Sequence, residues 1–352
     1  MALNEGRSMK VSWILGLGLL VGGCGSSEGA DQAGGTTQLA ASCNLNSGWP
    51  GDEYCIPPPP EEQGFQLHYG PSRYDDAAEV AKYLIEPGID IEIDVPYTSG
   101  NKDDVFFYKR QYRMRRGSHH LIVSTFGAGS SVGTERRLGG SQNVVKDNPT
   151  GEIPPENVGI GMSLAASSAL NLNLHHFNGT SEPLLREAWV NFWYVDPGTV
   201  TQEAKEIFLW ADGPGLPPGG TVTVRGTRTI NAEGRVLTLY GHRHSNNVRF
   251  SAYRTRGGNR ELLLEDYDWL EPSVFEYNSL TQNAAPDPVA KVAGAYSGIL
   301  DLQAGDVLEW ECDIENKRTE SITFGQNEAA TSEMCILVGD GVGPALDGLS
   351  DF

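Results

Sequence analysis

Ile89-Asp90-Ile91-Glu92-Ile93-Asp94-Val95 alternates strictly between aliphatic and acidic side chains. Successive side chains of a β-strand point to opposite faces, so this alternation predicts a half-buried strand. Further predicted strands cover residues 105–112, 120–126, 170–177, 188–194, 221–225, 236–240, 248–253, 261–264, 307–312 and 334–338. The 43 Gly and 20 Pro punctuate nearly every gap, and the one convincing helical stretch is Asp75–Leu84. We therefore expect an all-β protein with two tandem jelly-roll-like β-sandwich domains and long loops.

Composition excludes one class of partner. The 352 residues include 46 acidic and 26 basic side chains, which give a formal net charge of −20. Nucleic-acid binding needs a cationic surface that displaces the counterions of the phosphates. We therefore expect no nucleic-acid partner.

The N-terminus is typical of an exported protein. Arg7 and Lys10 give the N-terminus a positive charge. The apolar run Val11–Leu20 that follows is too short to span a bilayer. The run ends in Leu20-Val21-Gly22-Gly23-Cys24, which resembles the lipobox of bacterial lipoproteins, whose cysteine carries the lipid. Gly25 after Cys24 implies the outer membrane of a Gram-negative cell. A buried helix of a cytoplasmic protein is the alternative, which the Gly/Ser-rich stretch that follows disfavours.

These patterns divide the chain into five segments. Residues 1–24 are the lipoprotein signal, and residues 25–63 are a flexible linker with Cys43, Cys55 and the stiff spacer Ile56–Pro60. Residues 64–198 and 199–345 are the two sandwich domains, separated at Asp196-Pro197-Gly198, and residues 346–352 are a tail. Each domain has an ordinary size.

Export also bears on the cysteines. With Cys24 lipidated, four remain, and an even number in an oxidising compartment indicates disulfides rather than thiolate metal sites. Proximity along the chain favours Cys43–Cys55 and Cys312–Cys335, although four cysteines allow three connectivities.

Six of the seven histidines fall into three tight clusters: His119-His120, His175-His176 and His242-x-His244. Imidazole is the commonest metal-binding side chain. His242 and His244 follow the apolar stretch Val236–Tyr240, and residues two apart on a strand share a face, so both can reach one metal. A solvent-facing pair near a turn is the alternative.

The adjacent pairs are weaker evidence. On a regular strand His119 and His120 point to opposite faces, so a shared metal requires a bulge, which Gly117-Ser118 makes plausible. Periodicity does not choose between His175 and His176. Met334, in Glu333-Met334-Cys335, would by itself be read as core filler.

The order His-His, His-His, His-x-His, Glu-Met-Cys resembles the type II copper, ascorbate-dependent monooxygenases, which include the peptidylglycine hydroxylating enzymes and dopamine β-hydroxylase. The resemblance covers roughly residues 100–340. It includes Gly117–Val123, Pro154–Gly159, Leu174-His175-His176-Phe177, and Gly305–Cys312. The third of these motifs selects His175 as the ligand and aligns His176 with the family's tyrosine.

The resemblance implies two mononuclear copper sites, one in each domain, that face each other across a cleft. His119, His120 and His175 would hold the electron-supplying copper, and His242, His244 and Met334 the copper that activates O₂. It also implies the Cys312–Cys335 disulfide and ascorbate or an equivalent reductant as co-substrate. The residue types agree, because a thioether is soft and favours Cu(I), whereas zinc rarely takes methionine.

The sequence departs from the family around the substrate. Peptide-hydroxylating members carry an arginine where this chain has Tyr240, and an asparagine and a tyrosine where it has Ile336 and Val338. Alternation puts Tyr240 on the face of His242, and Ile336 and Val338 on that of Met334. We expect an aromatic and aliphatic substrate pocket without a cationic clamp, unless these three are packing residues. The family's additional disulfides near the first His-His strand are missing, which leaves the loops at 127–153 less constrained.

The leading hypothesis is therefore an exported copper monooxygenase. It would hydroxylate an activated C–H bond of a small, neutral or apolar substrate with O₂ and a reductant, and would contact the membrane through its lipid anchor only. The alternative is a non-catalytic copper-binding or copper-buffering surface lipoprotein. An adhesion or scaffold sandwich with incidental histidines is a third, weaker hypothesis.

Overall fold

The computed structural model describes Cys43 and residues 45–126, 136–148, 159–276, 279–281, 300–325 and 328–351. All of these belong to one compact unit, Thr36–Phe352. The predicted signal with Cys24, part of the loops at 127–153 and the motif residues 154–158 lie outside the described residues. Among the residues that are described, no helix is long and apolar enough to cross a membrane.

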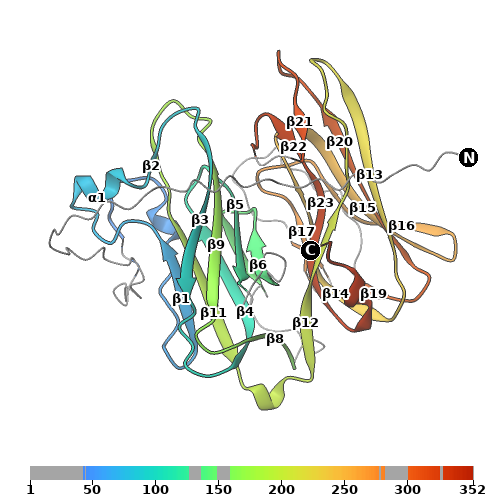
Figure 1. The fold of residues 1–352 in the computed structure, drawn as a ribbon, viewed down its shortest axis with the longest axis horizontal. Coiled ribbons are helices and arrows are strands. Elements are labelled where there is room, and N and C mark those ends of the chain that lie inside the picture. The colour runs from blue at the N-terminus through green and yellow to red at the C-terminus, as the bar shows by residue number, and fades with distance from the viewer. Residues whose placement is uncertain are drawn as a thin grey trace, which may run out of the picture. The chain divides into compact units, whose positions relative to one another are not determined.

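The chain folds into β-sandwich sheets, which confirms the all-β prediction (Figure 1). In the first half, a four-stranded sheet in the order β3-β9-β5-β6 shares one hydrophobic core with strands of a larger sheet, namely β1, β11, β4 and β8. The strands of this half are β1 (Gly64–Tyr69), β3 (Asp90–Thr98), β4 (Val105–Met114), β5 (Ser118–Thr125), β6 (Arg136–Ser141), β7 (Val145–Asn148), β8 (Ile160–Leu164), β9 (Ala169–Phe177) and β11 (Ala188–Val195).

The second half repeats the two-layered plan around its own core. A sheet in the order β13-β20-β15-β16 packs against β12, β23, β14 and β17. Its strands are β12 (Gln202–Trp210), β13 (Thr221–Thr229), β14 (Gly234–Arg243), β15 (Asn247–Arg256), β16 (Asn259–Asp266), β17 (Val274–Glu276), β18 (Ser279–Thr281), β19 (Leu300–Leu302), β20 (Val307–Glu315) and β23 (Cys335–Val342).

One large sheet runs through both halves. The short parallel pairing of β8 with β12 joins Ile160 to Gln202 and Gly161 to Glu203, which makes the larger sheets of the two halves continuous. The turn at which the sequence predicts a domain boundary contains the 3-10 helix η3 (Pro197–Thr199), between β11 and β12.

The remaining elements are short. They are the strand pairs β2 (Leu84–Ile85) with β10 (Leu184–Leu185) and β21 (Thr323–Phe324) with β22 (Ser332–Glu333), the helix α1 (Ala77–Ala81), and the 3-10 helices η1 (Asp52–Tyr54) and η4 (Pro344–Gly348). The predicted helix Asp75–Leu84 is too long. The side chain of Asp76 caps α1 by accepting a hydrogen bond from the main-chain N–H of Ala78. Leu84 does not continue the helix, because it belongs to β2 and pairs with Leu185 of β10.

The alternating stretch lies on β3 from Asp90 to Val95, at the edge of its sheet. Its apolar side chains Ile93 and Val95 pack against the first core. Pro96 is tolerated because an edge strand leaves one side of its backbone without a partner strand. The acidic side chains of the same strand lie on the other face.

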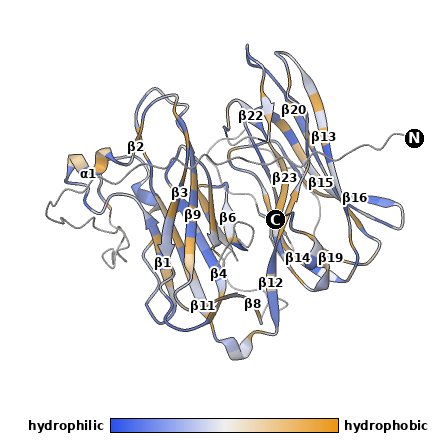
Figure 2. Cartoon of the chain, in the orientation of Figure 1, coloured by the Kyte–Doolittle hydropathy of each residue, from blue (hydrophilic) through white to orange (hydrophobic). Residues whose placement is uncertain are grey.

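Both predicted disulfides are confirmed. Cys43–Cys55 closes a loop ahead of the first half, with Cα atoms 5.6 Å apart. Cys312–Cys335, with Cα atoms 5.9 Å apart, joins β20 to the start of β23 inside the second core, where both cysteines are buried. In Figure 2, β23 is coloured largely hydrophobic, as its burial between β12 and β14 requires.

Candidate metal centre and adjoining pocket

Five histidines from three separate parts of the sequence converge into one cluster, which we call the five-histidine centre. They are His119, His120, His175, His242 and His244. The ring centroid of His119 lies 5.2 Å from those of His120 and His242, 5.1 Å from His175 and 4.9 Å from His244. The outer four also neighbour one another, at 5.1 Å (His120–His175), 5.2 Å (His120–His242), 5.5 Å (His242–His244) and 6.1 Å (His175–His244). His119 is therefore the one ring in contact with all the others.

A β-bulge brings two adjacent histidines into this centre. Ser118 pairs with His176 and His120 pairs with His175, so His119 is an extra residue of β5 that has no partner residue in β9. Gly117, just before it, has a φ of 89°, which glycine adopts without strain. The structure thus contains the distortion that the sequence requires for His119 and His120 to share a site.

The four histidines around His119, which we call the outer histidines, each have one ring nitrogen within hydrogen-bond distance of an oxygen atom. The contacts are His120 Nε2 to Asn173 Oδ1 at 3.0 Å, His175 Nε2 to Asp90 Oδ1 at 2.5 Å, His242 Nδ1 to Gln142 Oε1 at 3.0 Å and His244 Nδ1 to the Ser332 carbonyl at 3.1 Å. These oxygens accept, so the nitrogen that faces each of them carries the hydrogen. The other nitrogen keeps its lone pair, as in a metal-binding histidine with a supporting acceptor.

Five of the six remaining ring nitrogens are buried without a hydrogen-bond partner in the described part of the chain: His120 Nδ1, His175 Nδ1, His244 Nε2 and both nitrogens of His119. A buried polar atom without a partner costs about 1–3 kcal/mol, so such atoms are rare. Five of them lie within one cluster, which indicates a site shaped for a bound group such as metal ions.

Burial keeps three of these imidazoles neutral. It lowers the pKa of His119 and of His242 well below the usual range, and the neighbouring imidazoles add to both shifts. Burial also lowers the pKa of His244 to about 3. Because a metal binds the neutral ring, these three side chains are in the ligand form at neutral pH.

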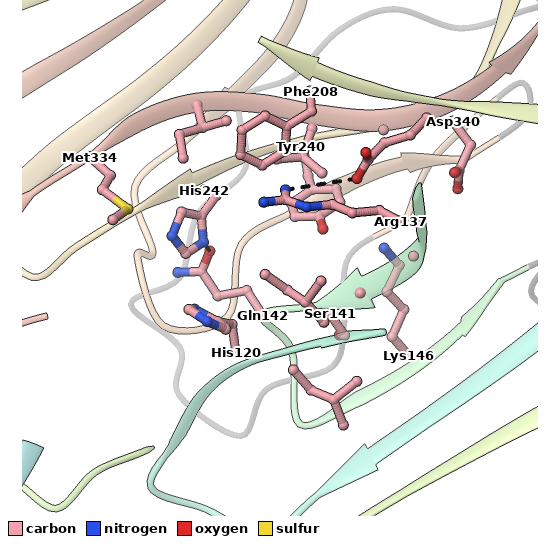
Figure 3. Close-up of a pocket in the computed structure, with 18 of the residues that line it drawn as sticks. His120, Arg137, Ser141, Gln142, Lys146, Phe208, Tyr240, His242, Met334 and Asp340 are labelled. Carbon is pink, nitrogen blue, oxygen red and sulfur yellow. Dashed lines mark hydrogen bonds and ion pairs between the residues drawn. The ribbon is translucent and has the colours of Figure 1, made fainter. Parts of the chain in front are cut away.

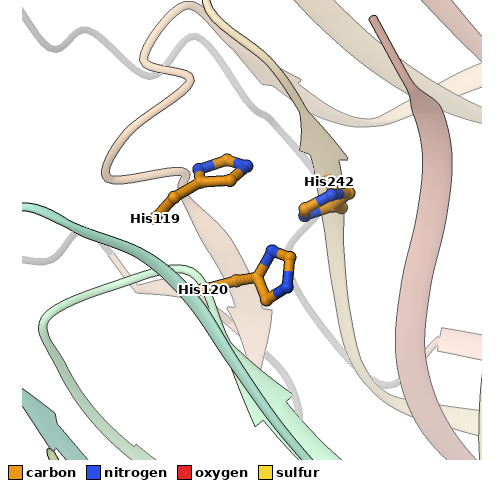
Figure 4. Close-up of side chains that lie close together, drawn as sticks. All are labelled: His119, His120 and His242. Atoms are coloured by element: carbon orange, nitrogen blue, oxygen red, sulfur yellow. The ribbon is translucent and has the colours of Figure 1, made fainter. Parts of the chain in front are cut away.

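The geometry defines two sets of three ligands. His119, His120 and His242 form the first set (Figure 4), and His119, His175 and His244 form the second set. Within each set, one ring nitrogen per residue lies within 4.8 Å of the others. The sequence-based division places His175 with His119 and His120, and His244 with His242. The structure groups them differently, because each set takes histidines from both halves.

Met334 lies beside the first set. β14 and β23 pair so that Tyr240 is opposite Val338 and His242 is opposite Ile336. The pairing ends with Arg243 opposite Cys335, so Met334 lies directly before the paired part of β23. Met334 also lines a pocket together with His120 and His242 (Figure 3), which puts its thioether at the edge of the centre.

The pocket has a volume of about 210 Å³ and opens from the first set. Tyr240, Ile336 and Val338, which the sequence proposes as substrate contacts, line one wall, and Phe208 and Trp210 of β12 extend it. Met334, Ile336 and Phe208 form a small apolar cluster of their own. The structure therefore brings together the predicted pocket residues and three of the predicted ligands.

The pocket is less apolar than the sequence predicts. Arg137 of β6 and Lys146 of β7 line it, together with the carboxylates of Glu92, Glu206 and Asp340. Arg137 lies over the ring of Phe208 at 3.7 Å and reaches Glu206 at 3.8 Å, and the Lys146 Nζ atom is 4.3 Å from the Tyr240 ring centroid. Neither β6 nor β7 has a strand pattern in the sequence. The sequence therefore did not predict that Arg137 and Lys146 line the pocket.

Glu333 is another residue to which the sequence assigns no role. Its carboxylate accepts hydrogen bonds from the main-chain N–H groups of Asn246, at 2.6 Å, and His244, at 3.2 Å. Burial raises the pKa of Glu333 to about 7. It thereby holds the turn after His244 against the segment that carries Met334.

The loop between β6 and β7 fastens the centre to the second half. Gln142, which bonds to His242, also donates from its amide nitrogen to the carbonyl oxygens of Arg243 and Trp269. The ring of Trp269 lies 5.2 Å from that of His119 and covers it. The two halves therefore meet directly over the histidines.

Two histidines lie outside both ligand sets. His176 is buried on β9 and belongs to neither, which agrees with the choice of His175 by resemblance. His68 contacts Glu187 at 2.9 Å, and Arg115 Nε reaches the same carboxylate at 2.7 Å. His68 is thus part of a structural ion-pair network.

Comparison with known proteins adds little. No protein-family model matches the sequence, and no curated protein matches it either. The fold has weak likenesses to capsid proteins: the STIV MCP (13% identity over 82% of this chain and 100% of that chain, TM-score 0.28) and the major capsid protein P2 of bacteriophage PM2 (8% identity, 73% and 100%, TM-score 0.25). At these scores the likenesses support no inference about function.

Proposed function

We propose that this protein is a copper-dependent monooxygenase that hydroxylates a C–H bond of a small molecule. The observation that carries this proposal is the five-histidine centre, whose outer rings are each oriented by an oxygen acceptor and whose first set opens onto a pocket. The five inner nitrogens without partners, next to a pocket, support a reactive metal site over a structural cluster or a storage site.

Copper fits this donor set better than the common alternatives. Five neutral imidazoles and a thioether suit Cu(I) and Cu(II), whereas structural zinc takes four ligands, most of them thiolate or imidazole. Magnesium and calcium prefer oxygen ligands. Among the described residues, the oxygen atoms around this centre contact the outer nitrogens of the histidine rings and do not face its interior. When bound, copper would supply the one-electron chemistry that couples O₂ and a reductant such as ascorbate to hydroxylation.

The chain's own residues would bind and orient the substrate. Tyr240, Ile336, Val338 and Phe208 offer an apolar wall that leads to His242 and Met334, so that an apolar part of the substrate can lie next to the first set. The charged residues that line the same pocket would receive a polar end of the substrate: Arg137, Lys146, Glu206 and Asp340. Figure 3 shows Arg137, Lys146 and Asp340 beside the aromatic rings. Gln142 and Asn173 hold the rings of His242 and His120 in place.

Oxygen uptake tests this proposal. Protein loaded with copper and supplied with ascorbate is expected to consume O₂ only when a substrate is present, across a panel of aromatic and acyl compounds. Copper bound without uptake on any compound would instead favour the non-catalytic copper-binding lipoprotein. The variant His68→Gln, outside the centre, is the matched control.

Met334→Leu separates catalysis from copper binding. Leucine has a similar volume, so the fold and the histidine ligands are expected to survive. Loss of the thioether is expected to lower substrate-dependent uptake at least about tenfold, which corresponds to about 1.4 kcal/mol of activation free energy. Uptake equal to that of the wild type would show that Met334 is packing only.

We also propose that the protein is exported and anchored to the outer membrane through a lipid on Cys24. The lipobox-like segment Leu20–Cys24 supports this proposal. Cys24→Ser is expected to abolish incorporation of a radiolabelled fatty acid and to release the protein from the membrane fraction. Unchanged membrane association would contradict it.

A further inference from the structure

We propose that the five-histidine centre holds two copper ions bridged by the imidazole ring of His119, rather than two separate mononuclear sites. This inference rests on the copper centre of the proposed function and specifies its form. It differs from the arrangement that the sequence resemblance implies, in which His119 binds one ion only.

A count of the inner nitrogens supports the bridge. The four outer histidines each have one nitrogen that faces no oxygen acceptor: His120 Nδ1, His175 Nδ1, His242 Nε2 and His244 Nε2. His119 contributes both of its nitrogens, neither of which has a hydrogen-bond partner among the described residues. The six atoms fill two three-nitrogen sites only if His119 serves both.

Other arrangements leave an atom unsatisfied. A single ion, or two ions of which one binds His119, would use one of its nitrogens and leave the other buried without a partner. That atom would have lost its hydrogen bond to water with no contact in its place. The bridge is the arrangement in which every inner nitrogen of the centre has a ligand role.

The position of His119 suits a bridge. Its ring contacts all four others, and its two ligand sets use different strands, with His120 and His242 in one and His175 and His244 in the other. In Figure 4 one of its ring nitrogens is turned toward His242, and the other lies on the far side of the ring. Metal–nitrogen bonds of about 2 Å would draw each set, now within 4.8 Å, slightly inward.

The surroundings can balance the charge. Binding of the second ion replaces the remaining N–H proton of His119, which is released to solvent, and the bridging ring becomes an anion. Asp90 lies 2.5 Å from His175, and Glu92 lies 3.8 Å from His120. These two carboxylates of β3 flank one ion each, and they offset the added positive charge.

The two ions would be unequal. His120, His242 and Met334 line the pocket, so the ion in the first set would face substrate and O₂. His119, His175 and His244 do not line it, and all three are at most 1% exposed. The enclosed ion would therefore exchange electrons through the shared ring of His119.

Spin quantitation of the copper-loaded protein tests the bridge. Total copper is measured by elemental analysis, and Cu(II) by integrated electron paramagnetic resonance at low temperature. The bridge predicts two copper ions per chain with a signal several-fold below the total copper, because the unpaired electrons couple through the ring. Acid denaturation, which releases the ions, is expected to restore the full signal.

Variants make the test specific. His119→Gln is expected to abolish the signal loss, so that all bound copper is visible, whereas His176→Phe, a matched change outside both sets, is expected to retain it. If His119→Gln does not fold, His175→Ala opens the second set alone and is expected to bind one fully visible copper.

Three results would overturn the bridge: two copper ions with full signal in the wild type, binding of a single copper, or a signal loss that persists in His119→Gln. Oxygen uptake, measured separately, keeps the two proposals distinct. Full signal with substrate-dependent uptake would overturn the bridge and leave the monooxygenase, whereas a coupled pair without uptake would do the reverse.

Discussion

Asp90 and Glu92 show how much the acidic face of one strand contributes to the centre. In the sequence they are the polar half of an alternating stretch, and a solvent-facing role is the natural expectation. In the structure Asp90 reaches His175, and Glu92 lies across from His175 in the β3–β9 register and near His120. Although burial opposes it, the neighbouring side chains of His120 and Asn173 lower the pKa of Glu92 to about 2. Such partners depend on strand pairing over more than 80 residues, which alternation does not encode.

Asp90→Asn is expected to weaken copper binding. The carboxylate fixes the His175 ring and raises its basicity, and loss of such a partner typically lowers metal affinity about ten- to hundredfold. Competition against a chelator of known affinity measures the change. Asp103→Asn removes an exposed carboxylate beyond the far end of β3 and is the control. Equal affinities in the two variants would show that Asp90 does not support a ligand.

The convergence of the histidines could be predicted, but their grouping could not. Residue types and the His-x-His alternation single out His242 and His244, and the need for a bulge at His119 follows from two adjacent histidines. Which histidines share an ion depends on how the two halves meet. That contact is made by Gln142 and Trp269, which carry no sequence signal for it.

At the scale of elements, alternation locates the strands that are half-buried and regular. β3, β4, β9, β14 and β20 begin within two residues of their predicted starts. β12 is missed because Gln202–Phe208 mixes polar and apolar residues without a period of two, and β6 and β7 because they are short and rich in glycine or charge. These are the strands that supply Phe208, Arg137 and Lys146 to the pocket. The sequence could therefore predict the strands that carry the histidines but not the strands that complete the pocket.

The Cys312–Cys335 disulfide is expected to stabilise the strand that follows Met334. Replacement of both cysteines by alanine is expected to lower the free energy of unfolding by about 3 kcal/mol, given the 23-residue separation. Denaturant titration measures the change, and copper affinity is expected to fall with it. Replacement of Cys43 and Cys55, which lie ahead of the sandwiches, is expected to leave copper affinity unchanged. Equal copper affinities after both replacements would contradict a role for the buried disulfide in the centre.

Glu271 makes the contact between the halves sensitive to pH. Its carboxyl group accepts from the main-chain N–H of Val144 and the side chain of Asn143, both at 3.2 Å, and burial raises its pKa to about 7. The unfolded chain releases this proton near pH 4.5, so the folded state holds more protons between pH 4.5 and 7. Stability from this group is therefore present below pH 4.5 and is lost as the pH rises to 7.

Glu271→Gln removes this dependence. Relative to the variant, the wild type is expected to lose on the order of 2 kcal/mol of unfolding free energy between pH 4.5 and 7.5. Urea titrations of the metal-free proteins at several pH values measure the difference, with Glu53→Gln as an exposed control. A constant difference across this range would contradict the assignment.

At the scale of the whole described unit, the centre links two hydrophobic cores. Each ligand set combines histidines of β5 or β9 with one from the end of β14, so a bound ion would connect the first half to the second. The short β8–β12 pairing, the buried ion pair of Arg110 with Asp340 and the loops around Gln142 and Glu271 also join the halves. Metal binding is thus expected to stabilise the two halves together.

Removal of the metal tests this link. Copper present at a hundred to a thousand times its dissociation constant is expected to add about 3–4 kcal/mol to the unfolding free energy. A chelator is expected to lower the melting temperature accordingly, and calorimetry should then resolve the halves as separate transitions. Identical unfolding curves with and without copper would contradict a metal that bridges the halves.

Anomalous diffraction at the copper edge, from crystals of the copper-loaded protein, distinguishes a bridged copper pair from two separate sites. We expect two anomalous peaks on either side of the His119 ring, one bounded by His120 and His242 and the other by His175 and His244. Peaks bounded by His119, His120 and His175 on one side, and by His242, His244 and Met334 on the other, would contradict it. So would the absence of copper from these histidines.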